Sequence, residues 1–341
     1  MFGDAENFMS NIIEAFPLGP PPWPTLDPFL FCVHHNDDYP AGSQDMSPNA
    51  SLYGRNIGSD FSQKDGWSMY HGDSVPGFPR HPHRGFETVT IARRGYIDHS
   101  DSLGATARFG HGDCQWMTAG AGVVHSEMFP LVNTDKRNPT ELFQIWLNLP
   151  QKEKMVPPYF TMLWKESIPF VEENNVRVDI FAGRFRDKTP PPPPPNSWAA
   201  QTESDIAIWS LTLKTSGTIT LPPSKEGTNR TLYCFLGEEI FIDDTPIPIG
   251  YGLRIRPNVA ITITNNKSTA EILLLQAKPL NEPVAKHGPF VMNTHEEIRQ
   301  AIIDYQRTGF GGWPWKRKDP VHNAREGRFA IHADGRKEHK G

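Results

Sequence analysis

The stretch GFPRHPHRGFETVTI, residues 77–91, combines a His-x-His pair with an apolar alternating run that is typical of a β-strand. Side chains two residues apart leave the same face of a strand, so His81 and His83 point together. His125 and Glu127 repeat that spacing in the segment VVHSE. We expect these four residues to close around one metal ion.

The composition bounds the class of protein. The chain has 341 residues, enough for two domains, and its 33 prolines and 28 glycines favour many turns and an all-β fold. A net charge of -5 argues against a nucleic-acid surface, so no direct nucleic-acid binding is expected. No apolar run approaches the roughly 18 residues of a membrane span, and no membrane association is expected.

The predicted compartment follows from the cysteines and the start of the chain. Cys32, Cys114 and Cys234 lie far apart in apolar or strand-like segments, as buried free thiols do in a reducing compartment. Residues 1–16 contain no Lys or Arg and resemble neither a secretory signal nor a transit peptide. We therefore expect a cytoplasmic or nuclear protein.

Short apolar segments punctuated by Gly or Asp recur between residues 66 and 182 and again between 206 and 277, which predicts two β-sandwiches or barrels. The second region contains no histidine, so it cannot hold the same kind of site. A capping box at Thr294 begins a short amphipathic helix. The predicted parts are a flexible lead-in at 1–25, a first barrel with the metal site at 26–188, a polyproline linker or loop at 189–196, a second barrel without metal plus the helix at 197–312, and a mobile tail at 313–341.

Three imidazoles and one carboxylate suit Fe(II), Mn(II), Ni(II), Co(II), Cu(II) or Zn(II). No cysteine lies beside them, which argues against a structural zinc site of the thiolate kind. Four protein ligands on an octahedral ion leave two positions for water, O2 or a chelating substrate. This ligand set favours non-haem iron and oxygen chemistry.

The residues near the four ligands predict a small-molecule pocket. Two residues, Gln115 and Glu87, are candidates to orient a ligand or a bound water, and Glu87 has the alternative of a structural, hydrogen-bonded carboxylate. His34 and His35 are adjacent, so they point to opposite faces and are expected to form a polar loop. The expected apolar lining consists of Phe78, Phe86, Trp116 and Met117.

Four motifs resemble the pirin family of the cupin superfamily. They are HPHRGFETV at 81–89, GDCQWMTAGAG at 112–122, HSEM at 125–128 and HGPFVMNT at 287–294. The resemblance runs from about residue 26 to residue 309. It implies two stacked cupin barrels, with metal only in the first. It also assigns the metal to the four ligands above, with Glu127 in the role that other cupins give to the carboxylate at Glu87.

The resemblance implies iron as the metal and two functions. The first is a quercetin 2,3-dioxygenase-like enzyme, a monomer that cleaves a flavonol-like substrate with O2, with Glu127 as the catalytic base. The alternative is an iron-dependent, redox-sensing transcriptional co-regulator that acts on a protein partner without turnover. The chain departs from the family in a longer segment at 39–66, in the run Pro190–Pro195 and in the tail past Gly309.

Overall fold

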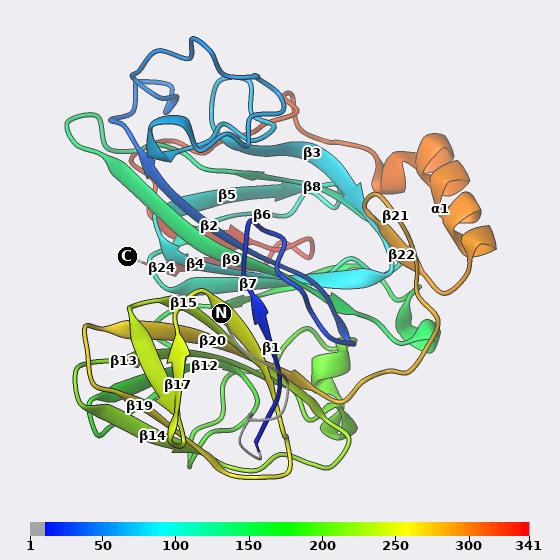
Figure 1. The fold of residues 1–341 in the computed structure, drawn as a ribbon. Helices are drawn as coiled ribbons and strands as arrows, with labels where there is room; N and C mark the ends of the chain where they lie inside the picture. The colour runs from blue at the N-terminus through cyan, green and yellow to red at the C-terminus, as the bar shows by residue number, and fades with distance from the viewer. Residues whose placement is uncertain (1–10, 341) are drawn as a thin grey trace. The chain divides into compact units, whose positions relative to one another are not determined.

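A computed structural model describes residues 11–340. Its contacts divide the chain into two compact units, each assembled from two separate stretches. The first unit comprises Val33–Lys165 and Glu282–Gly341, and the second comprises Met1–Cys32 and Glu166–Asn281. Both are built of antiparallel strands (Figure 1).

The first unit contains a five-stranded and a six-stranded sheet. In spatial order the five-stranded sheet consists of β10 (Tyr159–Leu163), β7 (Asp113–Thr118), β4 (Phe86–Arg94), β9 (Asn138–Asn148) and β2 (Phe29–Tyr39). The six-stranded sheet consists of β24 (Lys337–Lys340), β23 (Arg328–Ile331), β6 (Thr106–Gly110), β5 (Tyr96–Asp101), β8 (Val123–Met128) and β3 (Gly77–His83). Their inner faces share one core, in which Met117 and Leu142 of one sheet belong to the same cluster as Val123 and Phe109 of the other.

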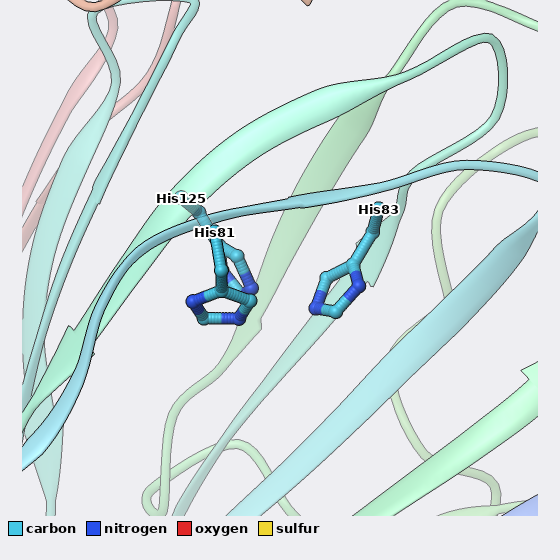
Figure 2. A group of neighbouring side chains, drawn as sticks. All are labelled: His81, His83 and His125. Atoms are coloured by element: carbon cyan, nitrogen blue, oxygen red, sulfur yellow. The ribbon is translucent and has the colours of Figure 1, made fainter. Parts of the chain in front are cut away.

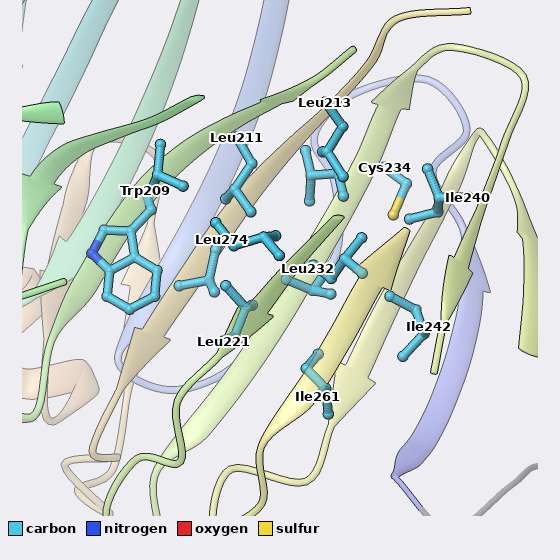
Figure 3. Packing of buried hydrophobic residues seen from close by; sticks show 14 of the residues in the cluster. Trp209, Leu211, Leu213, Leu221, Leu232, Cys234, Ile240, Ile242, Ile261 and Leu274 are labelled. Atoms are coloured by element: carbon cyan, nitrogen blue, oxygen red, sulfur yellow. The ribbon is translucent and has the colours of Figure 1, made fainter. Parts of the chain in front are cut away.

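The second unit pairs a seven-stranded with a four-stranded sheet. The larger consists of β1 (Ile12–Pro17), β18 (Tyr251–Ile255), β15 (Asn229–Leu236), β20 (Ala270–Ala277), β13 (Ala207–Leu213), β12 (Val176–Ala182) and β11 (Phe170–Glu173). The smaller consists of β14 (Gly217–Leu221), β19 (Ile261–Asn265), β16 (Glu239–Ile242) and β17 (Thr245–Pro248). Apolar side chains from both sheets, such as Leu232 and Ile261, fill the space between them (Figure 3).

Helical structure is sparse. Between residues 11 and 340 there is one α-helix, α1 (His295–Thr308), which begins at the predicted capping box of Thr294 and Glu297. It packs in the first unit beside the hairpin of β21 (Ala285–His287) and β22 (Phe290–Met292). The 3-10 turns are Lys64–Gly66, Gln151–Glu153, Trp198–Ala200, Thr202–Ser204 and Gly309–Gly311. Among these residues, no helix has the length and apolar character that a membrane crossing needs.

The predicted domain boundaries differ from those of the two observed units. Within the predicted lead-in, β1 pairs with β18 in the second unit, and residues 1–10 lie outside the described residues. The stretch 170–182, predicted for the first barrel, forms β11 and β12 of the second unit because β12 pairs with β13. The helix α1, predicted for the second barrel, belongs to the first unit. Since both regions alternate apolar and polar residues in the same way, the pattern carries no information on which sheet a strand joins.

Residues 313–340 of the predicted mobile tail 313–341 are a structured part of the first unit, and residue 341 lies outside the described residues. Within residues 313–340, β23 pairs with β6 and is followed by β24. Buried Arg108 explains the docking, because its guanidinium bonds Asp98 and donates to the backbone carbonyls of His322, Asn323 and Glu326. The polyproline segment 189–196 lies inside the second unit's stretch Glu166–Asn281, so it is a loop of one unit and not a linker between units.

Candidate metal centre

Three histidines converge where β3 meets β8. The two strands pair antiparallel, with His81 opposite His125 and His83 opposite Val123. One ring nitrogen from each of His81, His83 and His125 lies within 4.8 Å of the others. Ligand bonds of about 2.1 Å hold the donors of one ion about 3–4 Å apart, so the three rings lie close enough for small side-chain rotations to bring them onto one ion. Figure 2 shows the rings of His81 and His83 leaving one strand on the same side, toward the ring of His125.

The hydrogen bonds of these rings leave nitrogens available for a metal. The Nδ1–H of His81 donates to the carbonyl of Pro79 at 2.9 Å, which leaves Nε2 with its lone pair. The Nδ1 of His83 and the Nε2 of His125 are buried and have no hydrogen-bond partner among residues 11–340. A buried nitrogen without a partner is costly, and a metal ion would satisfy each of them.

Burial also keeps the three rings neutral. It lowers the pKa of His81 to about 4, with only partial opposition from the Pro79 hydrogen bond. Burial and the neighbouring histidines lower the pKa of His83 and of His125 well below 6.5. Because a metal binds the neutral imidazole, little competition from protons is expected near pH 7. The donor set fits a first-row divalent ion, as the sequence predicted.

Glu127 lies beside this group, on the same face of β8 as His125. Its Oε2 is 3.9 Å from Nε2 of His125 and accepts from Nε2 of Gln144 at 2.7 Å. Its Oε1 accepts from the hydroxyl of Thr90 at 3.1 Å. Burial raises the pKa of Glu127, although His99 and these two hydrogen bonds oppose the rise. Glu127 stands outside the group of three histidines, so its role as fourth ligand and as catalytic base stays a prediction.

Glu87 faces away from Glu127. The strand β4 starts only at Phe86, after a turn at Arg84 and Gly85, and this turn breaks the alternation that would have placed Glu87 on the face of His83. Thr90 contacts Glu127, and Glu87, three residues earlier, points to the opposite face. There its carboxylate accepts from the hydroxyl of Thr118 at 2.6 Å. This geometry favours the structural alternative for Glu87 over the interpretation as a residue that orients a metal ligand.

The predicted pocket residues divide between two faces. The ring of Phe86 lies 5.0 Å from that of His83, and that of Phe78 lies 6.4 Å from that of His81. In the ladder of β7 with β4, Gln115 is opposite Thr90 and Met117 is opposite Thr88, so both share the face that contacts Glu127. Trp116 is opposite Val89 on the other face, and its prediction as a pocket residue is wrong.

Three residues near the site were missing from the prediction. Gln144 and Trp146 come from β9, which pairs with the other edge of β4. The ring of Trp146 lies 5.4 Å from that of His83 and 4.3 Å from that of Phe86. His99 of β5 lies across the ladder from Glu127. The alternation within β9 could have separated its two faces, but only the non-local pairing shows which face meets the histidines.

The C-terminal motif at 287–294 completes the turn after His83. The amide of Val291 donates to the carbonyl of Arg84 at 3.0 Å, and Arg84 also forms an ion pair with Asp304 of α1. Gly85 has φ of +84°, and a Cβ there would lie 1.9 Å from the carbonyl oxygen of Val291. The close approach of two distant motifs therefore requires glycine at this position.

A family model described as Pirin matches residues 23–147, and one described as Pirin C-terminal cupin domain matches residues 208–311. The chain belongs to the pirin family. A pirin-like protein of Solanum lycopersicum is 39% identical over 239 residues, which are 69% of this chain and 77% of that protein. The pirin of Mus musculus is 34% identical over 73% of this chain and 84% of its own length. The resemblance seen in the motifs is confirmed.

Two further comparisons bear on the chemistry. A protein of Pseudomonas aeruginosa named "putative quercetin 2,3-dioxygenase" is 36% identical over 69% of this chain and 80% of its own length. The crystal structure of a quercetin 2,3-dioxygenase from Acinetobacter baumannii superposes with a TM-score of 0.69 at 27% identity, over 89% of this chain and 99% of that one. The predicted all-β, two-cupin architecture is confirmed.

Proposed function

We propose that this pirin-family protein is a metal-dependent dioxygenase of the quercetin 2,3-dioxygenase type, with Fe(II) as its metal. The observation that carries the proposal is the convergence of three neutral histidines, two of which have a buried nitrogen without a hydrogen-bond partner in the described part of the chain. The names of the relatives from Pseudomonas aeruginosa and Acinetobacter baumannii support the reaction class. When bound, the metal would supply a Lewis acid and a place for O2.

The surroundings fit an aromatic substrate. Phe86 and Trp146 pack together beside His83, and Phe78 lies beside His81. Aromatic and apolar walls with a few polar groups are typical of small-molecule sites. A flavonol would place its flat rings against these side chains and present its 3-hydroxyl and 4-carbonyl oxygens to the centre.

Glu127 is the residue that we propose as proton acceptor. Its carboxylate is held by Gln144 and Thr90 next to His125, so it keeps one orientation. It would take the proton of the flavonol 3-hydroxyl, and burial raises its pKa, which strengthens it as a base. In the overall reaction both oxygen atoms of O2 enter the products, one ring carbon leaves as carbon monoxide, and the heterocycle opens to a phenolic ester.

The test is metal analysis followed by turnover. Protein loaded with Fe(II) should consume O2 and release carbon monoxide with a flavonol, and should do neither with the 3-methoxy analogue, which has no hydroxyl proton to give. His83→Ala is the matched control, because it removes one metal ligand and leaves Glu127 in place. Absence of turnover with a panel of flavonols, by protein of full iron content, would overturn the proposal. Partner capture that depends on the iron oxidation state, without turnover, would favour the co-regulator instead.

A further inference from the structure

We infer that Asp101 and His99 form a positioning pair that holds His125 with its proton on Nδ1 and its lone pair on Nε2, ready for a metal. The inference rests on the proposed metal site. It concerns residues that contact His125 from β5 and that are not themselves ligands.

The pairing of β5 with β8 places these residues together. Asp101 is opposite His125 in the ladder, and His99 is opposite Glu127. All are buried, with His99 and His125 fully inaccessible and Asp101 exposed by 1%. The Nε2 of His99 lies 3.2 Å from Oδ2 of Asp101, and the Nδ1 of His99 lies 3.4 Å from Nδ1 of His125.

The carboxylate of Asp101 determines where the protons lie along the hydrogen-bonded series Asp101, His99 and His125. An ionised carboxylate only accepts hydrogen bonds, so the Nε2 of His99 must carry the proton that bonds Asp101. The inference assigns a neutral ring to His99, whose Nδ1 then accepts a hydrogen bond from the Nδ1 of His125. The Nε2 of His125 is left with a lone pair. That atom is the buried nitrogen without a hydrogen-bond partner among the described residues.

Asp101 is itself fixed. Its Oδ1 accepts from the amides of Leu103 at 2.9 Å and Ala105 at 3.0 Å, which leaves Oδ2 for His99. The ring of Phe160 stands at 69° to that of His99 with centroids 5.3 Å apart, and His332 stacks on Phe160. The pair is therefore preformed by the fold and does not need the metal to assemble it.

Partners of this kind typically change metal affinity by about 10- to 100-fold when they are removed. The isosteric change Asp101→Asn tests the inference more specifically than removal of the side chain, because the asparagine amide nitrogen can donate a hydrogen bond to Nε2 of His99. The proton of His99 then moves to Nδ1, that of His125 moves to Nε2, and the metal-binding lone pair is lost. His99→Phe removes the acceptor for the Nδ1 proton of His125 but does not move that proton to Nε2. His99→Gln offers an amide oxygen that can accept this hydrogen bond in place of the imidazole nitrogen.

The experiment combines two measurements on the full chain. Nitrogen NMR with labelled histidine, on metal-free protein, reports which nitrogen of His125 carries the proton. Competition with a chelator measures the affinity for Ni(II), a redox-stable probe. Circular dichroism and thermal unfolding show whether each variant folds. Ser100→Ala, on the same strand but between the two residues of the pair, is the matched control.

We expect His125 to carry its proton on Nδ1 in the wild-type protein and on Nε2 in Asp101→Asn. Asp101→Asn should bind Ni(II) 10- to 100-fold more weakly, His99→Gln should bind more tightly than His99→Phe, and Ser100→Ala should match the wild type. A wild-type His125 protonated on Nε2, or an unchanged affinity in Asp101→Asn, would overturn the inference. If the wild type binds no metal but carries the Nδ1 proton, the proposed function fails and the positioning pair stands.

Discussion

Replacing Lys154 by Met should remove a pH dependence from the stability of the first unit. The ammonium of Lys154 is buried and donates to the carbonyls of Gly85 at 2.8 Å and Val291 at 3.3 Å and to Oδ1 of Asn148 at 2.6 Å. It therefore holds the turn after His83 against β9 and β22. Burial lowers its pKa from 10.5 to about 8, and the charges of Glu282 and Glu297 oppose the fall only in part.

The sign follows from proton binding in the two states. Between about pH 8 and pH 10.5 the unfolded chain keeps the lysine proton while the folded chain releases it, so the free energy of unfolding rises with pH. One pKa unit corresponds to about 1.4 kcal/mol, and the full shift corresponds to about 3 kcal/mol. Between pH 7 and pH 10 we expect the wild type to gain about 2.5 kcal/mol relative to Lys154→Met.

Urea unfolding of wild type, Lys154→Met and Lys152→Met at several pH values measures this gain. Lys152 is exposed two residues away and is the matched control. Titrations of tyrosine and cysteine affect all three proteins and cancel in the differences. A wild-type advantage over Lys154→Met that is equal at pH 7 and pH 10 would refute the reasoning, as would the same slope for Lys152→Met.

Three further predictions test the fold and the site. Glu127→Gln should weaken metal binding at least tenfold, whereas Glu87→Gln should leave the metal affinity unchanged. Glu87→Gln should instead lose about 1 kcal/mol of stability, because its hydrogen bond with Thr118 is weakened. The reverse order of affinities in chelator competition would reject Glu127 as a metal ligand. Gly85→Ala should cost roughly 1–3 kcal/mol more than Gly104→Ala in urea unfolding, because both have positive φ but only Gly85 meets a backbone oxygen. Phe329→Ala should cost about 3 kcal/mol, and a loss below about 0.5 kcal/mol in the same assay would mean that the C-terminal strand is not docked in solution.

The sequence predicted the parts of the fold that depend on local pattern. The His-x-His spacing placed His81 and His83 on one face, and the capping box marked the start of α1. The sequence pattern did not predict which distant strands pair with one another. Whether β12 joins one sheet or another depends on contacts with β13, and the approach of β23 to β6 depends on the buried charge of Arg108. Neither leaves a periodic signal in the chain.

The segment at 39–66 shows the same limit near the site. It leads into Tyr70, whose ring stacks on Phe78 at 5.2 Å and whose hydroxyl donates to Asp37. Buried Asp37 also accepts from the amide of Ser68, and Arg55 lies over the ring of Trp67. Within the segment, Gln63 donates to Oδ1 of Asp37 at 2.9 Å, so the segment contacts the network that holds Tyr70 against Phe78. Phe78 in turn lies beside His81, with ring centroids 6.4 Å apart.

The difference between the two carboxylates has a simple geometric origin. Counting residues from His83 places Glu87 on its face only if the strand continues without a break. The turn at Arg84 and Gly85, where β22 contacts the chain, interrupts the strand. Glu87 therefore lies on the opposite face from the one that counting from His83 predicts. No turn separates Glu127 from His125, since β8 runs unbroken through both residues and pairs on both sides. The two side chains therefore share one face. A carboxylate on the same uninterrupted strand as a histidine is therefore the better candidate for a shared metal than one across a turn, even when the sequence distances look equivalent.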